Sequence, residues 1–182
     1  VLTELREGPV DTHVFPLAVH EPSYTMLDSL HEEVAGPDYD YVVGIGGGSS
    51  MDLAKGVATL LRNEGSALSY RGFPELDAEP VPVAAVPTTA GTGSEVTFNA
   101  VVTETGEEPR ESRKLGINSR HNYPTHAIVD PNLTVSCPER VAVSAGMDAL
   151  VHTLESFAAC SATPTSRLYS RKAFDYVFNA LG

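Results

Sequence analysis

At 182 residues, with 42% hydrophobic and 20% charged side chains, the chain has the composition of a soluble globular protein with one sizeable core and room for the start of a second domain. Its formal net charge of −12 argues against a nucleic-acid partner, because phosphates require a basic face. No apolar run reaches the ~18 residues of a membrane helix, no signal peptide is visible, and two cysteines make no disulfide framework, so we expect a cytoplasmic protein without membrane contact.

The predicted elements alternate between strands and helices in the first part of the chain. Helices are expected where turn residues are scarce or apolar residues recur at helical spacing, at 1–7, 23–34, 50–61, 139–160 and 165–181. Strands are expected where short apolar runs lie between turn residues, at 11–15, 41–45, 82–86, 96–102, 114–117 and 127–129, the last three linked by hairpins. This order predicts an α/β fold with a mostly parallel sheet and flanking helices.

The pattern of predicted elements changes near residue 135. Only helices are expected beyond Pro138. We therefore predict an α/β domain over 1–135, followed over 136–182 by the beginning of an all-helical domain.

A glycine cluster, GIGGGSS at 44–50, separates a predicted buried strand from a predicted helix. In open α/β sheets ligands bind at such a junction, because glycine lets the backbone approach a pyrophosphate and the first helical amides bind anions. Ser49 and Asp52 have the spacing of a capping box, which would start the helix here. A tight turn that needs glycine only for its backbone explains the cluster equally well. The G-x-G-x-x-G fingerprint is not met, because its last position is Ser49.

A second small, polar segment, PTTAGTGSE at 87–95, follows the next predicted strand. It offers hydroxyl groups and flexible backbone, and Thr92 with Glu95 again has the spacing of a capping box. Taken alone, the segment is an ordinary loop. Paired with the glycine cluster at a neighbouring strand end, it favours a nucleotide cleft.

Asp148 and His152 are four residues apart in a predicted helix and therefore share one helix face. A carboxylate and an imidazole in this arrangement can hold one divalent ion and leave positions open for other ligands. From the spacing alone, a surface Asp–His pair or a capped core histidine is the simpler interpretation. The other histidines have no partner at ligand spacing, and we expect them at the surface or in packing.

Taken together, GGGSSMDLAK at 46–55, PTTAGTGSEVT at 87–97 and GMDALVHTLESF at 146–157 resemble the iron-containing (group III) alcohol dehydrogenase family in order and spacing. The resemblance runs from about residue 10 to the end of the chain. It implies a Rossmann-like dinucleotide-binding domain of the dehydroquinate-synthase type, followed by a helical metal-binding domain. It also implies hydride transfer between NAD or NADP and a small alcohol or aldehyde, with Fe²⁺ or alternatively Zn²⁺ polarising the substrate oxygen.

The family motifs assign roles to individual residues of this sequence. By resemblance, Gly47, Gly48 and Ser49 contact the cofactor pyrophosphate. Thr88, Thr89 and Thr92 line the nicotinamide and phosphate region with Ser94 nearby, and Lys114 reaches the cofactor ribose. Asp148 and His152 are two of the metal ligands. Beyond these ligands, the resemblance points to no separate catalytic residue.

The resemblance also leaves questions open. The family has two further metal-binding histidines in its C-terminal domain and an acidic residue after its opening strand, and this sequence contains neither, so we expect an incomplete copy of the enzyme. NAD and NADP are not distinguished, and we expect a homodimer or larger homo-oligomer because the family implies one. Two alternatives are a sugar-phosphate cyclase of the dehydroquinate-synthase type and a non-catalytic nucleotide-binding remnant.

Overall fold

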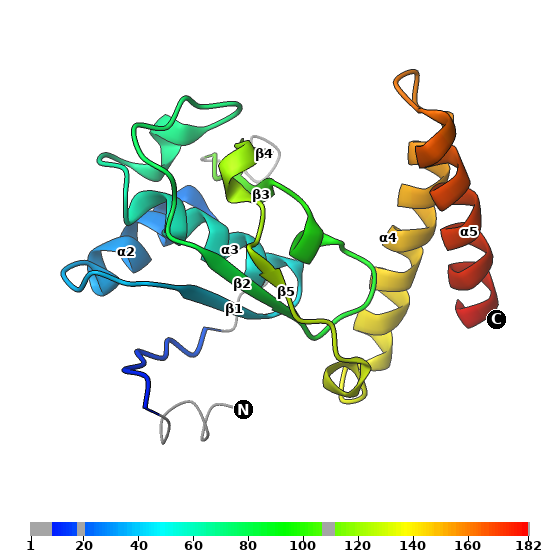
Figure 1. The fold of residues 1–182 in the computed structure, drawn as a ribbon, viewed down its shortest axis with the longest axis horizontal. Helices are drawn as coiled ribbons and strands as arrows, with labels where there is room; N and C mark the ends of the chain where they lie inside the picture. The colour runs from blue at the N-terminus through cyan, green and yellow to red at the C-terminus, as the bar shows by residue number, and fades with distance from the viewer. Residues whose placement is uncertain (1–8, 18–20, 107–111, 182) are drawn as a thin grey trace.

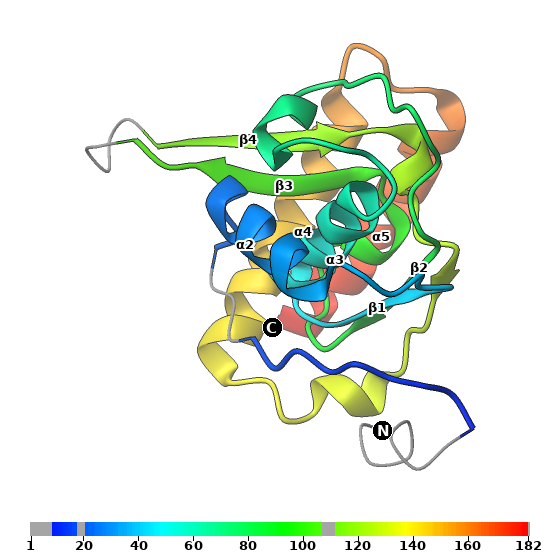
Figure 2. The same cartoon turned by 90° about the vertical axis from the view of Figure 1, so that its left-hand side faces the viewer.

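The computed structural model describes residues 9–17, 21–106 and 112–181. In these ranges α3 is enclosed by two β-layers, and a pair of long helices extends from one side (Figures 1 and 2). The parallel sheet packs on one side of α3 and an antiparallel strand pair on the other. The α/β class with a parallel sheet followed by helices is confirmed. The helix expected at 1–7 lies outside the described residues.

The parallel sheet has the order β1-β2-β5, formed by β1 (Val42–Gly46), β2 (Val83–Pro87) and β5 (His126–Ala127). Its register pairs Val42 with Val83 and Gly46 with Pro87, so β1 and β2 end at the same edge. Every residue of β2 is buried, as expected for a central strand that is covered on both faces. The strand expected at 11–15 is wrong. That segment pairs with none of the described strands, and a strand needs a neighbour to satisfy its backbone groups.

Two helices form the core with the sheet. α2 (Tyr24–Val34) starts at Ser23, whose hydroxyl accepts from the Met26 amide, and α3 (Gly48–Leu60) is buried along most of its length. Leu27 of α2 lies fully buried against Gly56 of α3, where an added Cβ would come within 2.6 Å of the leucine side chain. Glycine at position 56 therefore sets how closely the two helices approach. The helices expected at 23–34 and 50–61 are confirmed.

The antiparallel pair consists of β3 (Asn99–Glu104) and β4 (Arg113–Asn118). β3 starts later than expected because Ser94–Val96 form a short 3₁₀ helix, η2. The antiparallel pairing expected of 96–102 and 114–117 is confirmed. The hairpin to 127–129 is wrong, because β5 runs parallel to β2 instead of pairing with β4. The other 3₁₀ turns are η1 (Ala67–Tyr70), η4 (Arg120–Asn122) and η5 (Pro131–Thr134).

The chain continues into two long helices, α4 (Glu139–Ala158) and α5 (Pro164–Leu181), as expected from the sequence. They pack against each other, with the Ser156 and Ser170 hydroxyls hydrogen-bonded across the contact. Ala145 is buried where α4 meets the loop that carries Gly91. Among the helices in the described ranges, none combines the length and apolarity needed to span a bilayer.

Candidate cofactor and metal site

A cleft of about 330 Å³ lies between the amino-terminal end of α3, the 92–97 loop, β3, β4 and α4. It brings together seven of the residues predicted for the site: Gly48, Ser49, Thr92, Ser94, Lys114, Asp148 and His152. The other three lie beside it instead of lining it. The Thr88 amide donates to the Gly46 carbonyl at 2.8 Å, and Thr89 faces Gly47. The three motifs thus meet at one edge of the sheet, where β1 and β2 end.

The glycine cluster makes the turn from β1 into α3. Gly46 has φ 151°, and an added Cβ would come within 2.5 Å of the Ser50 hydroxyl. Gly47 is the N-terminal cap of α3 and makes no side-chain hydrogen bond to its first turn. A helix start whose cap is glycine is suited to an anion such as a pyrophosphate. The capping box of Ser49 and Asp52 is wrong, because the helix already starts at Gly48 and Asp52 is buried.

The second loop packs directly on the first. A Cβ at Gly48 would lie 3.1 Å from Thr92, so a side chain at position 48 would require Thr92 to shift by a few tenths of an ångström. The Thr92 hydroxyl accepts from the Ser94 amide at 3.4 Å, and η2 is capped by Gly93. The capping box of Thr92 with Glu95 is therefore wrong, because the capping residue has no side chain.

The Thr89 hydroxyl is an unused polar group between the loops. It is the only buried side-chain nitrogen or oxygen in the described ranges that lacks a hydrogen-bond partner. An added Cβ at Gly47 would be 3.5 Å from this hydroxyl. Buried hydroxyls are normally satisfied, so an orphaned one marks a place for a ligand or an ordered water. This position fits a group bound at the glycine cluster.

A buried ion pair behind the cleft was not foreseen from the sequence. The Lys55 ammonium lies 3.3 Å from the Asp52 carboxylate and also donates to the Ser94 hydroxyl at 2.8 Å. Burial raises the pKa of Asp52, and the charge of Lys55 opposes that shift. Burial likewise lowers the pKa of Lys55 against the attraction of Asp52. The sequence did carry a signal, because Asp52 and Lys55 are spaced three apart on an otherwise uncharged helix.

Asp148 and His152, the pair predicted to bind a metal, lie on the α4 wall of the cleft. His152 Nδ1 is 3.8 Å from Asp148 Oδ2, and both side chains are about half exposed. Within residues 9–17, 21–106 and 112–181, no group of three or more histidine, cysteine, aspartate or glutamate side chains could hold a metal ion. The chemistry of this pair suits Fe²⁺ or Zn²⁺, which take imidazole nitrogen and carboxylate oxygen. Within the described residues, Asp148 and His152 alone do not make up a complete metal site.

Lys114 lies at the mouth of the cleft in an ion pair with Glu21. Its ammonium is 2.9 Å from Glu21 Oε1, and both side chains are at least half exposed. Hydrogen bonds from Lys114 and Thr103 lower the pKa of Glu21. Glu21 also lines the cleft, although no sequence motif singled it out.

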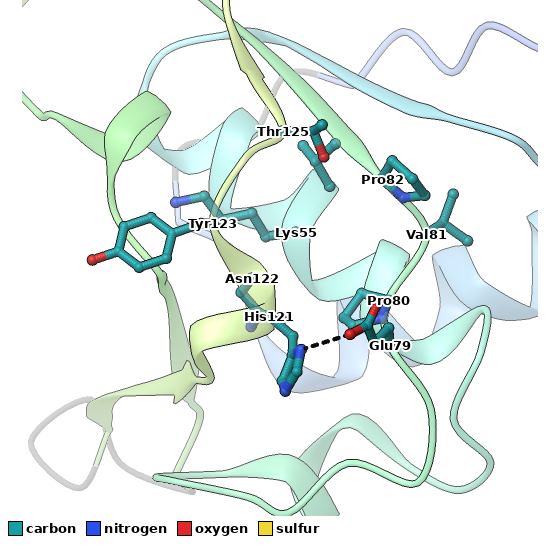
Figure 3. Close-up of a pocket in the computed structure, with 10 residues that line it drawn as sticks. Lys55, Glu79, Pro80, Val81, Pro82, His121, Asn122, Tyr123 and Thr125 are labelled. Carbon is teal, nitrogen blue, oxygen red and sulfur yellow. Dashed lines mark ion pairs between the residues drawn. The ribbon is translucent and has the colours of Figure 1, made fainter.

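A smaller cavity of about 150 Å³ lies beside the beginning of β2, and none of the predicted site residues lines it. His121 faces Glu79 there at 3.6 Å, and the Lys55 side chain leads away from that pair (Figure 3). The cavity is therefore separate from the cleft that holds the three motifs.

The family assignment follows from the match of a family model. The model for "Iron-containing alcohol dehydrogenase" matches residues 1–131. The chain belongs to the iron-containing alcohol dehydrogenase family. It is 36% identical to an NAD-dependent methanol dehydrogenase of Bacillus methanolicus over 177 residues. This alignment covers 97% of this chain and 45% of that relative. It is 34% identical to a sulfoacetaldehyde reductase of Bilophila wadsworthia, covering 95% of this chain and 44% of the relative.

Solved structures of the family share the fold. An alcohol dehydrogenase from Oenococcus oeni superposes with a TM-score of 0.88 at 29% identity, over 99% of this chain and 46% of that one. A sulfoacetaldehyde reductase from Bifidobacterium kashiwanohense, solved in complex with NAD⁺, gives a TM-score of 0.75 at 33% identity, over 90% of this chain and 44% of that one. The chain thus spans less than half the length of these relatives.

Proposed function

We propose that this chain forms the cofactor-binding part, and one wall of the metal site, of an oxidoreductase that transfers hydride between NAD or NADP and a small alcohol or aldehyde. The observation that carries the proposal is the single cleft that joins the glycine cluster, Thr92 and Lys114 to Asp148 and His152. A nicotinamide held by the two loops would reach the face of α4 that bears this pair.

The residues of the chain divide the work of binding and orientation. Gly47, Gly48 and Ser49 would receive the pyrophosphate at the glycine-capped start of α3. The unsatisfied hydroxyl of Thr89 would donate to a group bound there. Lys114 would reach the cofactor ribose from the mouth of the cleft, exchanging part of its interaction with Glu21.

Asp148 and His152 would present a carboxylate oxygen and an imidazole nitrogen to Fe²⁺, or alternatively to Zn²⁺, together with ligands from outside the described residues. When bound, such an ion supplies Lewis acidity toward the substrate oxygen.

Several features of the relatives support the oxidoreductase over the alternatives. The relatives compared above are named as dehydrogenases or reductases, which favours hydride transfer over a sugar-phosphate cyclase. The NAD⁺ complex of the Bifidobacterium reductase supports NAD as the first cofactor to test. The division at residue 135 and the cytoplasmic location stay proposals from the sequence, and a homo-oligomeric assembly stays a proposal from the family resemblance.

The test is NADH- or NADPH-linked reduction of short aldehydes in the polypeptide that carries this chain, purified without oxygen and supplied with Fe²⁺. His152→Ala removes one ligand, and losing about 3 kcal/mol of metal-dependent stabilisation predicts a rate at least ~100-fold lower. His31→Ala, which changes a histidine on α2 away from the cleft, is the matched control and should retain the rate. Equal rates in the His152→Ala and wild-type proteins, or no turnover with either cofactor, would overturn the proposal.

A further inference from the structure

Lys55 is a buried cation that has no role in the function proposed above. Its side chain has no exposed surface, although it extends from the middle of α3. Burying a lysine is costly unless it is paired and hydrogen-bonded, so a fold that retains one depends on its contacts. The use of this lysine is therefore to be found in the groups that surround its ammonium.

The ammonium of Lys55 joins three separate parts of the cleft wall. On its own helix it lies 3.3 Å from Asp52 Oδ1. Outside α3, the ammonium donates to Ser94 Oγ of η2 at 2.8 Å and to the Asn99 carbonyl of β3 at 2.9 Å. Thr97 Oγ1, between those two residues, is 3.5 Å away. An ammonium has three donors, and here they hold the segment 94–99 against α3.

The contacts are closed into a ring. The Ser94 hydroxyl accepts from Lys55 and donates to Asp52 Oδ1 at 2.5 Å. Asp52 also accepts from the Val101 backbone amide. The Asn99 side chain continues the connection to β4 through Asn118 Oδ1 at 2.8 Å. Burial lowers the pKa of Lys55 while Asp52 opposes the shift, so the carboxylate is what supports its charge.

The partners of Lys55 line the cleft, but Lys55 itself does not. Asp52, Ser94, Thr97 and Asn99 all line the cofactor cleft, whereas Lys55 lines the smaller cavity and is not among the residues of the cleft. Lys55 therefore lies behind the wall that the cofactor would touch. A charge in this place acts on the ligand through the groups that it holds.

We propose that Lys55 is a positioning residue for the cofactor cleft: its ammonium, paired with Asp52, locks the 94–99 segment onto α3 and so fixes the second cofactor loop against the glycine cluster. The lock itself is a property of the protein without ligand. Its consequence for the dinucleotide rests on the proposed function. Ser94 belongs to the same set of contacts, because its hydroxyl accepts from Lys55 and donates to Asp52.

The test compares Lys55→Met with Thr59→Val in the full chain. Methionine keeps an unbranched apolar stem and removes the charge. Thr59 is one turn further along α3, equally buried, and its hydroxyl bonds Asn122 away from the cleft, so Thr59→Val matches the loss of a buried polar group. Amide hydrogen exchange of 92–99 without ligand and NADH affinity by nicotinamide fluorescence are measured for both variants.

Lys55→Met should speed exchange across 92–99 and weaken NADH binding by ~10-fold or more, since a displaced binding group costs up to about two orders of magnitude. Thr59→Val should change neither. Unchanged exchange in Lys55→Met, or an equal effect of Thr59→Val on both readouts, overturns the lock. If the wild-type protein binds no dinucleotide, the proposed function is wrong. The exchange comparison then still tests whether Lys55 holds the 94–99 segment against α3.

A double variant addresses the case in which Lys55→Met alone fails to fold. Removing only the lysine leaves Asp52 buried without its partner, whereas Asp52→Asn with Lys55→Met removes both charges. The double variant should recover thermal stability but keep the fast exchange of 92–99 and the weakened NADH binding. Recovery of slow exchange and of affinity together with stability would reduce Lys55 to a structural role and overturn the proposal.

Discussion

Gly91 and Gly93 offer a matched test of how the loop at 87–95 packs against α4. Both have positive φ, at 131° and 69°, and they are separated only by Thr92. A Cβ at Gly93 would meet nothing within 4 Å, whereas a Cβ at Gly91 would lie 2.1 Å from the Ala145 carbonyl oxygen. The pair therefore separates backbone strain from a clash with helix α4.

The expected losses follow from these contacts. Alanine at Gly93 adopts the left-handed region without a clash, which costs roughly 1–2 kcal/mol. Alanine at Gly91 combines a strained backbone, roughly 1–3 kcal/mol, with overpacking of about 1–3 kcal/mol. Ordinary contact begins near 3.4 Å against 2.1 Å here, so α4 or the loop must move by about 1.3 Å. We expect Gly91→Ala to lower the free energy of unfolding by about 3–5 kcal/mol, a large share of a typical 5–15 kcal/mol.

Urea denaturation followed by circular dichroism measures both variants under one set of conditions. The Gly91→Ala midpoint should fall well below that of Gly93→Ala, with similar slopes. If the two variants lose stability equally, to within about 0.5 kcal/mol, the close contact between the loop and α4 does not exist as described.

Three further changes probe the core and the mouth of the cleft. Leu27→Ala should lower the free energy of unfolding by about 2–5 kcal/mol because Leu27 fills the fully buried contact with Gly56; a loss under about 1 kcal/mol in urea would contradict that packing. Since Lys114 and Thr103 lower the pKa of Glu21, its stabilising contribution should be fully present above the ordinary glutamate value of about 4.3 and lost as pH falls through the lower folded-state value. The difference in melting temperature between wild type and Glu21→Gln should then vanish in acid, and a difference that persists there would refute the pairing. Lys114→Met should weaken NADH binding about tenfold, as expected for the loss of one charged hydrogen bond of about 1.5 kcal/mol; an unchanged dissociation constant in a fluorescence titration would remove Lys114 from the site.

Local sequence patterns predicted most of the regular elements. Helical spacing located α2 and α3, and short apolar runs located β1 and β2, because these elements bury continuous apolar faces. The strand expected at 11–15 failed because strand formation depends on a neighbour that local pattern cannot reveal. β5 was placed in a hairpin for the same reason. Its parallel pairing with β2 is decided by chain topology beyond the segment itself.

The candidate site was predictable in part. Spacing alone placed Asp148 and His152 on one face, and the structure has them 3.8 Å apart. That this face looks onto the glycine cluster came from the family resemblance. Both capping boxes failed because glycine caps α3 and η2, while tertiary contacts draw Asp52 into the pair with Lys55. Asp52 is three residues from Ser49, the spacing of a capping box, and three residues from Lys55, the spacing of a helical ion pair. In the structure Asp52 is buried and pairs with Lys55.

The most direct test of the shared cleft is an exchange footprint with NADH. Amide hydrogen exchange is compared with and without saturating NADH across the whole chain. We predict protection in three separate segments, 46–52, 88–95 and 112–118. We predict little change in η1 (Ala67–Tyr70), which contributes no residue to the lining of the cleft. Protection confined to one of the three segments, or none at all under saturating NADH, would contradict the convergence of the two loops and Lys114 of β4 on one cofactor cleft.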